Sequence, residues 1–234
     1  MLITQDFQGQ HHADIEHTYA RLLQGFSWKK QRVVIVMPSA DTIHARVVLS
    51  WLNLLLPPNQ AHARVLALGC EVGEAYTSAV HDILHHKEWS EWEDMLTIEH
   101  DNLPPPEGAL RLFAGMEQHP EYAAIGGLYF KTGREGQLCA EIWGDITDPE
   151  YNARPQLPRT DGGLVECYGV PMGFTVWRLD MFKDTRLRKP WFKTFADCTQ
   201  DLYFWEDAQR HGYRCAIDCG TKVGHYDVLT DTIH

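Results

Sequence analysis

The sequence predicts an α/β protein in which helices flank a mostly parallel central sheet. Short, continuously apolar segments alternate, over the first 130 or so residues, with segments whose apolar residues repeat at helical spacing. Prolines, glycines or acids follow each of the apolar segments. Alternation of strand, helix and strand is typical of layered α/β folds with a parallel sheet. The chain of 234 residues, 44% of them hydrophobic, is long enough to bury a sizeable core.

The apolar segments account for the expected strands. Residues 33–37, 65–68, 95–98 and 122–126 each form a short apolar run, and we expect all of them to be buried parallel strands. Later in the chain, 138–143 predicts short strands of a hairpin, 168–178 a longer strand and 214–218 the last strand. The second half is otherwise less regular.

Helical periodicity accounts for the remaining elements. Apolar residues at 47, 48, 51, 52 and 55 define one helical face, closed by Pro57 and Pro58. Similar faces predict helices over 72–83, 107–118 and 201–211, and the second of these is entered through prolines, a favoured helix start. An amphipathic helix is also expected over 13–26, before the first strand.

Two acids at the end of the third expected strand are the first indication of chemistry. Glu99 and Asp101 are one residue apart, so on an extended chain their side chains point the same way. Paired carboxylates suit a hard divalent cation such as Mg²⁺ or Mn²⁺. Ligands of open α/β sheets bind at the carboxyl ends of the strands, where these acids lie.

Composition argues against nucleic-acid-binding and membrane proteins and favours a cytoplasmic location. The formal net charge of −11 argues against a general binder of nucleic acid or anionic membranes. The longest apolar stretches are too short to span a bilayer, so no transmembrane segment is expected. Six scattered cysteines without a C-x-x-C pair favour a reduced, cytoplasmic protein.

From Glu99 onward a series of motifs resembles one family. The chain resembles a GT-A-fold glycosyltransferase, similar to glycosyltransferase family 2, over about residues 32–228. The resemblance rests on segments in a fixed order: Thr97-Ile98-Glu99-His100-Asp101 with Pro104-Pro105, Tyr129-Phe130-Lys131, 165–182 with Gly169 and Gly173, Pro190-Trp191-Phe192, Gln200-Asp201-Leu202-Tyr203-Phe204, Gly212-Tyr213, Asp218 and Val223-Gly224-His225. It implies a Rossmann-like single domain of GT-A type with a smaller acceptor-side subregion.

The resemblance also implies roles for the acidic residues. Asp101 corresponds to a ligand of the divalent cation, Mn²⁺ or Mg²⁺, with Glu99 and the distant His225 as further ligands. Asp201 corresponds to the catalytic base of inverting members. Two positions depart from the family pattern, since the acidic motif reads Glu-His-Asp instead of Asp-x-Asp and Gln200 stands where relatives usually carry glutamate. Taken alone, His225 reads as an ordinary strand-end histidine and Asp201 as a helix N-terminal acid.

Further positions correspond to donor and acceptor contacts. The expected nucleotide-sugar contacts are Pro38, Ser39, Glu71, Tyr76, His100 and Lys131. The expected acceptor-side residues are Gly173, Trp191 and Trp205, with the two tryptophans offered as a stacking floor for a sugar. Core packing for Tyr76 and the tryptophans, and a solvated side chain for Lys131, are the alternatives.

The predicted organisation follows from these assignments. Residues 1–31 form an N-terminal extension, 32–130 a nucleotide-binding half, 131–228 an acceptor half and 229–234 a tail. The predicted activity is metal-dependent transfer of a sugar from a UDP- or GDP-sugar to a hydroxyl of a glycan, lipid, protein or modified nucleic acid. A basic cluster between 183 and 193 keeps a polyanionic acceptor open.

Two other functions stay open at this point. A catalytically weak GT-A-like domain that only binds sugar nucleotide or glycan would explain Gln200 and Glu99. A nucleotidyltransferase also places acids at strand ends around a metal, although the sequence lacks the glycine-rich basic first loop that such enzymes use.

Overall fold

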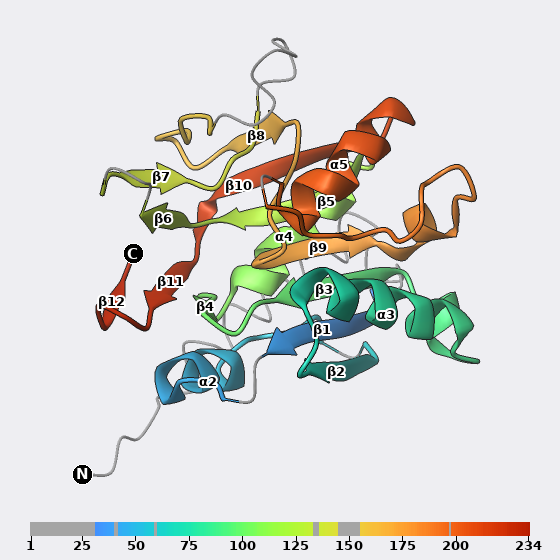
Figure 1. Ribbon diagram of the computed structural model, residues 1–234, viewed down its shortest axis with the longest axis horizontal. Helices are drawn as coiled ribbons and strands as arrows, with labels where there is room; N and C mark the ends of the chain where they lie inside the picture. The colour runs from blue at the N-terminus through green and yellow to red at the C-terminus, as the bar shows by residue number, and fades with distance from the viewer. Residues whose placement is uncertain (1–30, 40–41, 59, 133–135, 145–154, 197) are drawn as a thin grey trace. The chain divides into compact units, whose positions relative to one another are not determined.

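A seven-stranded sheet forms the centre of the computed structural model, with strand order β2-β1-β3-β9-β5-β10-β8 (Figure 1). Residues 31–39, 42–58, 60–132, 136–144, 155–196 and 198–234 are described. The chain divides into Met1–Lys30 and Gln31–His234, and the fold below is that of the second unit. The helix expected at 13–26 and most of the N-terminal extension lie outside the described residues.

The sheet is mixed but mostly parallel, as predicted. β1 pairs in parallel with β2 and β3, and β10 pairs in parallel with β5. β9 runs antiparallel between β3 and β5, and β8 runs antiparallel to β10 at the edge. The strands are β1 (Val33–Ser39), β2 (His62–Leu68), β3 (Asp94–Ile98), β5 (Tyr122–Leu128), β8 (Leu164–Cys167), β9 (Phe174–Arg178) and β10 (Arg214–Lys222).

Helices cover both faces of this sheet. The helices are α2 (Ala45–Leu52), α3 (Val72–His85), α4 (Gly108–Gln118) and α5 (Gln200–Arg210). On one face, α3 and α5 pack over Val34 and Val36 of β1 and Trp177 of β9. On the other, α4 packs over Val33 and Ile35 of the same strand. Alternate residues of β1 therefore enter two separate cores, which explains why its sequence is continuously apolar. The arrangement is the Rossmann-like α/β fold that the sequence predicts.

Two small sheets lie beside the main one. β4 (Asn102–Leu103), β11 (Gly224–Asp227) and β12 (Thr232–Ile233) form the first, and β6 (Phe130–Thr132) pairs with β7 (Leu138–Ala140) in the second. Short 3₁₀ turns, η1 (Trp89–Glu91) and η3 (Leu179–Lys183), complete the described elements. The pairing of β4 with β11 brings the C-terminal part of the chain next to the turn that follows β3.

Three sequence predictions about elements need correction. The segment 65–68 is not a buried strand, because β2 lies at the edge of the sheet and leaves Leu66 and Leu68 48% and 51% exposed. The helix expected over 47–55 ends at Leu52, well before the prolines. The strand expected over 168–178 begins only at Phe174, after Pro171, which has no N–H to give to a ladder. Among the described helices, none has the length and apolar character needed to cross a membrane.

Candidate active site

The acids Glu99 and Asp101 lie in a tight turn directly after β3. The turn is closed by a hydrogen bond of 3.0 Å from the Asn102 N–H to the Glu99 carbonyl. The Glu99 N–H donates to the carbonyl of Gly173 at 2.9 Å, which ties the turn to the start of β9. The acids therefore sit at the carboxyl edge of the parallel strands, where the sequence predicted them.

The C-terminal strand β11 brings His225 to this turn. His225 is opposite Asn102 in the β4–β11 ladder, and the N–H of Tyr226 donates to the carbonyl of Asp101 at 2.7 Å. The Nε2 atom of His225 lies 3.3 Å from Oδ2 of Asp101. The structure thus joins two residues that are more than 120 positions apart, and it joins them directly to each other.

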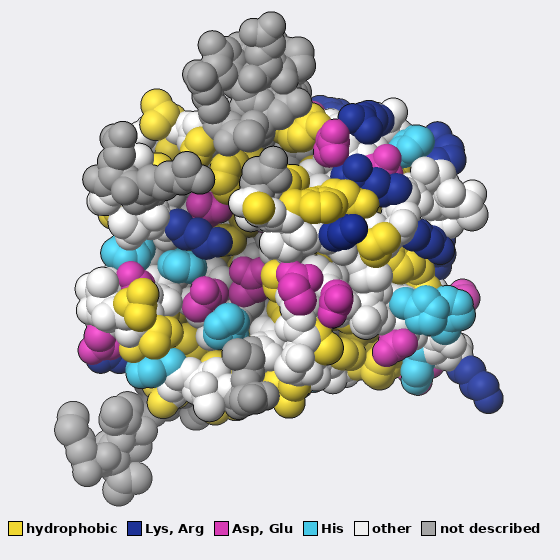
Figure 2. Space-filling model, in the orientation of Figure 1, with side chains coloured by type: hydrophobic (Ala, Val, Ile, Leu, Met, Phe, Trp, Pro, Cys, Tyr) yellow, Lys and Arg dark blue, Asp and Glu magenta, His cyan; other side chains and the backbone are white. Residues whose placement is uncertain are grey.

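Helix α5 supplies Asp201 in its first turn. Thr199 is the N-cap residue, its hydroxyl donates to Oδ1 of Asp201, and the N–H of Leu202 donates to the same oxygen at 2.9 Å. The amide of Gln200 points back to Oε1 of Glu99 at 3.5 Å. The start of α5 therefore adjoins the turn after β3, so Asp201 and Glu99 belong to one acidic site. Figure 2 shows acidic and histidine side chains gathered in the middle of the face it presents, with basic side chains close by.

Burial and mutual repulsion set the charge of these acids. Burial raises the pKa of Glu99 to about 7; Asp101 and Asp201 add to the shift by repulsion and Lys131 opposes it. Burial also raises the pKa of Asp201, against the hydrogen bond from Thr199. Burial acts in the same sense on Asp101, but the hydrogen bond and charge of His225 outweigh it, so the pKa of Asp101 falls below its ordinary value. Half-buried His100 contributes to that lowering.

Lys131 is the cation of this acidic site. It lies on β6, is half-buried, and its Nζ is 5.6 Å from the centroid of the Tyr129 ring. Burial opposes its charge, but the surrounding carboxylates, Glu99 and Glu141 first among them, raise its pKa above the ordinary value. Lys131 is thus more than a solvated surface side chain.

Glu141 belongs to the site although the sequence did not indicate it. It follows β7, is only 6% exposed, and its N–H donates to the carbonyl of Tyr129 at 3.0 Å. Burial raises its pKa, and the charge of Lys131 opposes the shift. The available signal was a single acid inside the apolar segment Cys139-Ala140-Glu141-Ile142-Trp143.

Several buried polar atoms around the turn lack a hydrogen-bond partner in the described part of the chain. They are Oδ1 of Asp101, both amide atoms of Asn102, the hydroxyl of Tyr129 and Nδ1 of His225. The Tyr129 ring stacks on His225 with centroids 5.9 Å apart and planes at 9°. Unpartnered buried polar atoms are uncommon and mark places where water, an ion or a ligand completes the bonding.

These atoms provide a direct test of whether a divalent cation fits. Oδ1 of Asp101 is an available oxygen ligand, and Glu99 offers a second carboxylate nearby, as Mg²⁺ and Mn²⁺ require. The Nε2 atom of His225 is already paired with Asp101, so His225 holds that carboxylate in place. Within the described residues, no three His, Cys, Asp or Glu side chains are arranged to enclose an ion by themselves. The donor set fits a cation that takes part of its ligands from a bound phosphate or from water.

Gly173 occupies the tightest position next to the turn. A Cβ atom at this residue would lie 2.6 Å from the hydroxyl oxygen of Tyr129 and 2.8 Å from Oδ1 of Asn102. Only glycine lets the backbone before β9 approach these side chains so closely. Gly173 therefore lies next to the turn after β3, and its acceptor-side role stays a prediction.

The expected nucleotide contacts are only partly brought together. Pro38 and Ser39 are the last residues of β1 and are buried in it, so they do not follow the strand as the sequence suggested. Tyr76 is fully buried on α3, yet its hydroxyl reaches Oε1 of Glu99 at 3.4 Å. Glu71 is the N-cap of α3: it accepts from the N–H of Glu74 at 3.1 Å and from the hydroxyl of Thr194 at 2.6 Å.

The tryptophans predicted as an acceptor floor are core residues. Trp191 is 3% exposed and Trp205 is fully buried. The Trp205 ring stacks on Trp177 with centroids 5.4 Å apart, and its N–H donates to the carbonyl of Val170 at 3.0 Å. Trp191 packs edge-on against Phe182 with ring centroids 6.2 Å apart, so both tryptophans belong to the aromatic core and not to an exposed stacking surface.

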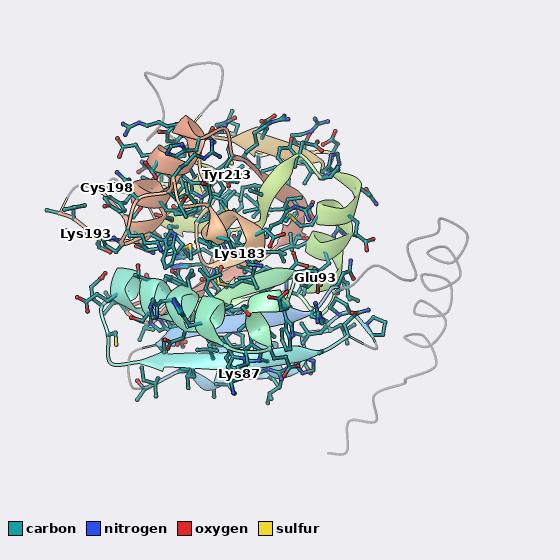
Figure 3. The ribbon with its side chains drawn as sticks, turned by 90° about the vertical axis from the view of Figure 1, so that its right-hand side faces the viewer. Lys87, Glu93, Lys183, Lys193, Cys198 and Tyr213 are labelled. Atoms are coloured by element: carbon teal, nitrogen blue, oxygen red, sulfur yellow. The ribbon has the colours of Figure 1, made fainter. Side chains whose placement is uncertain are left out.

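The basic cluster between 183 and 193 is largely neutralised. Lys183 pairs with Asp180 at 2.9 Å, Arg186 with Asp184 at 2.6 Å and Arg188 with Glu206 at 3.3 Å. Figure 3 shows Lys193 projecting at the margin of the molecule, apart from Lys183. The cluster therefore does not form one continuous basic surface for a polyanionic acceptor.

Comparison with known proteins identifies a shared fold but no family. No protein-family model matches the sequence, and no curated protein matches it. Among solved structures, A197 from STIV is similar with a TM-score of 0.59 and 13% identity, over 86% of this chain and 92% of A197. The fragment 1–349 of TarS from S. aureus is similar with a TM-score of 0.48 and 11% identity, over 80% of this chain and 57% of the fragment. The likeness to A197 extends over nearly the whole of both chains and shows that they share a fold.

Proposed function

We propose that this chain is a metal-dependent glycosyltransferase that moves a sugar from a nucleotide diphosphate donor, a UDP- or GDP-sugar, to an acceptor hydroxyl with inversion. The observation that carries the proposal is the meeting of Glu99, Asp101, Asp201 and Lys131 at the carboxyl edge of the parallel strands. This edge is where open α/β sheets bind nucleotides, and the same residues carry the resemblance to GT-A enzymes.

The turn after β3 is the proposed site for the diphosphate end of the donor. Asp101 would hold the divalent cation through its available Oδ1, with Glu99 beside it, and His225 would fix the orientation of Asp101. When bound, the cation would stabilise the negative charge that develops on the leaving diphosphate. Lys131 adds a second positive charge close to the same acids.

Asp201 is the proposed base on the acceptor side. The hydrogen bonds from Thr199 and from the N–H of Leu202 both reach Oδ1 and fix the carboxylate, and in this proposal Oδ2 takes the proton of the acceptor hydroxyl. The raised pKa of Asp201 makes it a better proton acceptor than an ordinary aspartate. The acceptor can be a glycan, a lipid, a protein or a modified nucleic acid, because each of them would present a hydroxyl group to this carboxylate.

The test is donor hydrolysis and transfer by Asp101→Ala and Asp201→Asn. Asp201→Asn is expected to lose activity by about 10²-fold or more, the typical contribution of an acid–base group. Asp101→Ala is expected to lose metal-dependent activity, because it removes the proposed ligand of the cation. Asp82→Asn is the matched control, because the Asp82 side chain is 79% exposed. Full activity in both site variants would refute the proposal.

One observation favours a second function, a binding domain without turnover. The buried amide of Gln200 faces Glu99 at 3.5 Å, in a position where the related enzymes carry an acid. This leaves one carboxylate fewer at the site. Calorimetry with Mn²⁺ and a panel of nucleotide diphosphates distinguishes the two functions, since metal-dependent binding without hydrolysis or transfer would identify the binding domain.

A further inference from the structure

Lys131 is held within the acidic site by the hairpin that carries it. β6 pairs with β7 so that Lys131 is opposite Cys139, and Glu141 follows β7 with its N–H bonded to the carbonyl of Tyr129. The hairpin thus holds Lys131 and Glu141 close together: the charge of Lys131 acts to lower the pKa of Glu141, and the charge of Glu141 acts to raise the pKa of Lys131.

A continuous series of contacts links Lys131 to the turn after β3. Its Nζ lies 5.6 Å from the centroid of the Tyr129 ring, which stacks on His225 at 5.9 Å, and Nε2 of His225 is 3.3 Å from Oδ2 of Asp101. The ammonium group of Lys131 is therefore within electrostatic range of Glu99, Glu141, Asp201 and Asp101, whose charges all act to raise its pKa. A buried carboxylate without a counter-charge is costly or must take up a proton, so an ammonium group nearby stabilises the charged form of these acids.

We infer that Lys131 is a built-in cation of this site and that it competes with a divalent ion for the same carboxylates. The free protein would then bind Mn²⁺ weakly, and a phosphate-bearing donor would supply the ligands that overcome the competition. The inference relies on the proposed function only for the identity of the metal ligands.

The test is calorimetric titration of Mn²⁺ into the full chain without any nucleotide. Lys131→Met is expected to bind Mn²⁺ about tenfold more tightly than the unaltered protein, which corresponds to about 1.4 kcal/mol. Lys131→Arg keeps the charge and is expected to bind as weakly as the unaltered protein. Lys87→Met is the matched control, because Lys87 is exposed and follows the C-terminal end of α3 (Figure 3). Folding of each variant is checked by circular dichroism.

Equal or weaker Mn²⁺ binding by Lys131→Met than by the unaltered protein would overturn the inference, as would no binding by either. A second measurement does not depend on the folding of that variant: the NMR signal of the Lys131 ammonium, identified by its loss in Lys131→Arg. The signal is expected to shift as Mg²⁺ is added, and an unchanged signal at saturating Mg²⁺ would overturn the inference. Neither experiment contains donor or acceptor, so a failure here is distinguishable from a failure of sugar transfer.

Discussion

Replacing Gly173 by alanine is predicted to destabilise the protein through its effect on Tyr129 and Asn102. The new Cβ would lie 2.6 Å from the Tyr129 hydroxyl, and ordinary contact begins at 3.4 Å, so the hydroxyl would have to retreat by about 0.8 Å. Tyr129 is 1% exposed and Asn102 is fully buried, which leaves little room for that movement. Overpacking of this kind costs about 1–3 kcal/mol.

Urea denaturation and thermal unfolding measure the cost. Gly173→Ala is expected to lower the melting temperature by about 2–4 °C for each kcal/mol lost. Gly115→Ala is the matched control: Gly115 lies within α4, and its added Cβ would meet only Cδ1 of Ile125, at 3.2 Å. Alanine is favoured over glycine in a helix by about 1 kcal/mol, which offsets the small shift that Ile125 must make, so this variant is expected to lose less stability than Gly173→Ala.

The same movement reaches the site, because Tyr129 stacks on His225. Gly173→Ala is therefore also expected to weaken binding of a nucleotide diphosphate, while Gly115→Ala is not. An unfolding transition for Gly173→Ala at the same urea concentration as the unaltered protein would refute the packing argument. Unchanged stability with weakened binding would place the role of Gly173 in the ligand contact alone.

Three further predictions concern charge, capping and metal. Burial raises the pKa of Asp94 to about 7, against the charge of Arg178, so the folded state binds more protons than the unfolded state between about pH 4 and pH 7. The free energy of unfolding therefore falls as the pH rises through that window, by up to about 4 kcal/mol. Asp94→Asn is expected to flatten this part of the stability profile measured with urea, and an unchanged profile would contradict the assignment. Glu71→Ala is expected to lower the free energy of unfolding by about 0.5–2 kcal/mol through loss of the α3 cap without changing donor affinity, and weaker donor binding in calorimetry would show instead that Glu71 contacts the nucleotide. Chelation of divalent ions is expected to abolish sugar transfer and added Mn²⁺ or Mg²⁺ to restore it, whereas transfer that persists in chelator would exclude the metal.

The elements that could be predicted are those whose pattern is local. The apolar run of β1 and the helical faces of α3 and α4 depend on neighbouring residues, so periodicity identifies them. β4 and β11 are short, and their pairing with each other is a long-range contact with no local pattern. The same limit applies to β2, whose apolar run gave no indication that it forms the edge of the sheet.

The parts of the site that depend on residue spacing along a strand could be predicted from the sequence. The parts that depend on how distant elements pack together could not. The position of Glu99 and Asp101 after a strand follows from the sequence alone, while the contact between Asp101 and His225 was expected only from the family resemblance. Burial of the Trp205 ring is decided by α5 packing on β9, which composition cannot show. Glu141 was not predicted as a site residue, because an isolated acid in an apolar segment matches no sequence motif.

The central claim is that the turn after β3 holds a divalent cation and a nucleotide diphosphate. The most direct measurement is a crystal structure of the full chain with Mn²⁺ and UDP or GDP. The account predicts the ion about 2.1–2.3 Å from a carboxylate oxygen of Asp101 and in contact with the diphosphate. Nucleotide bound elsewhere, or an ion that does not touch Asp101, would contradict it.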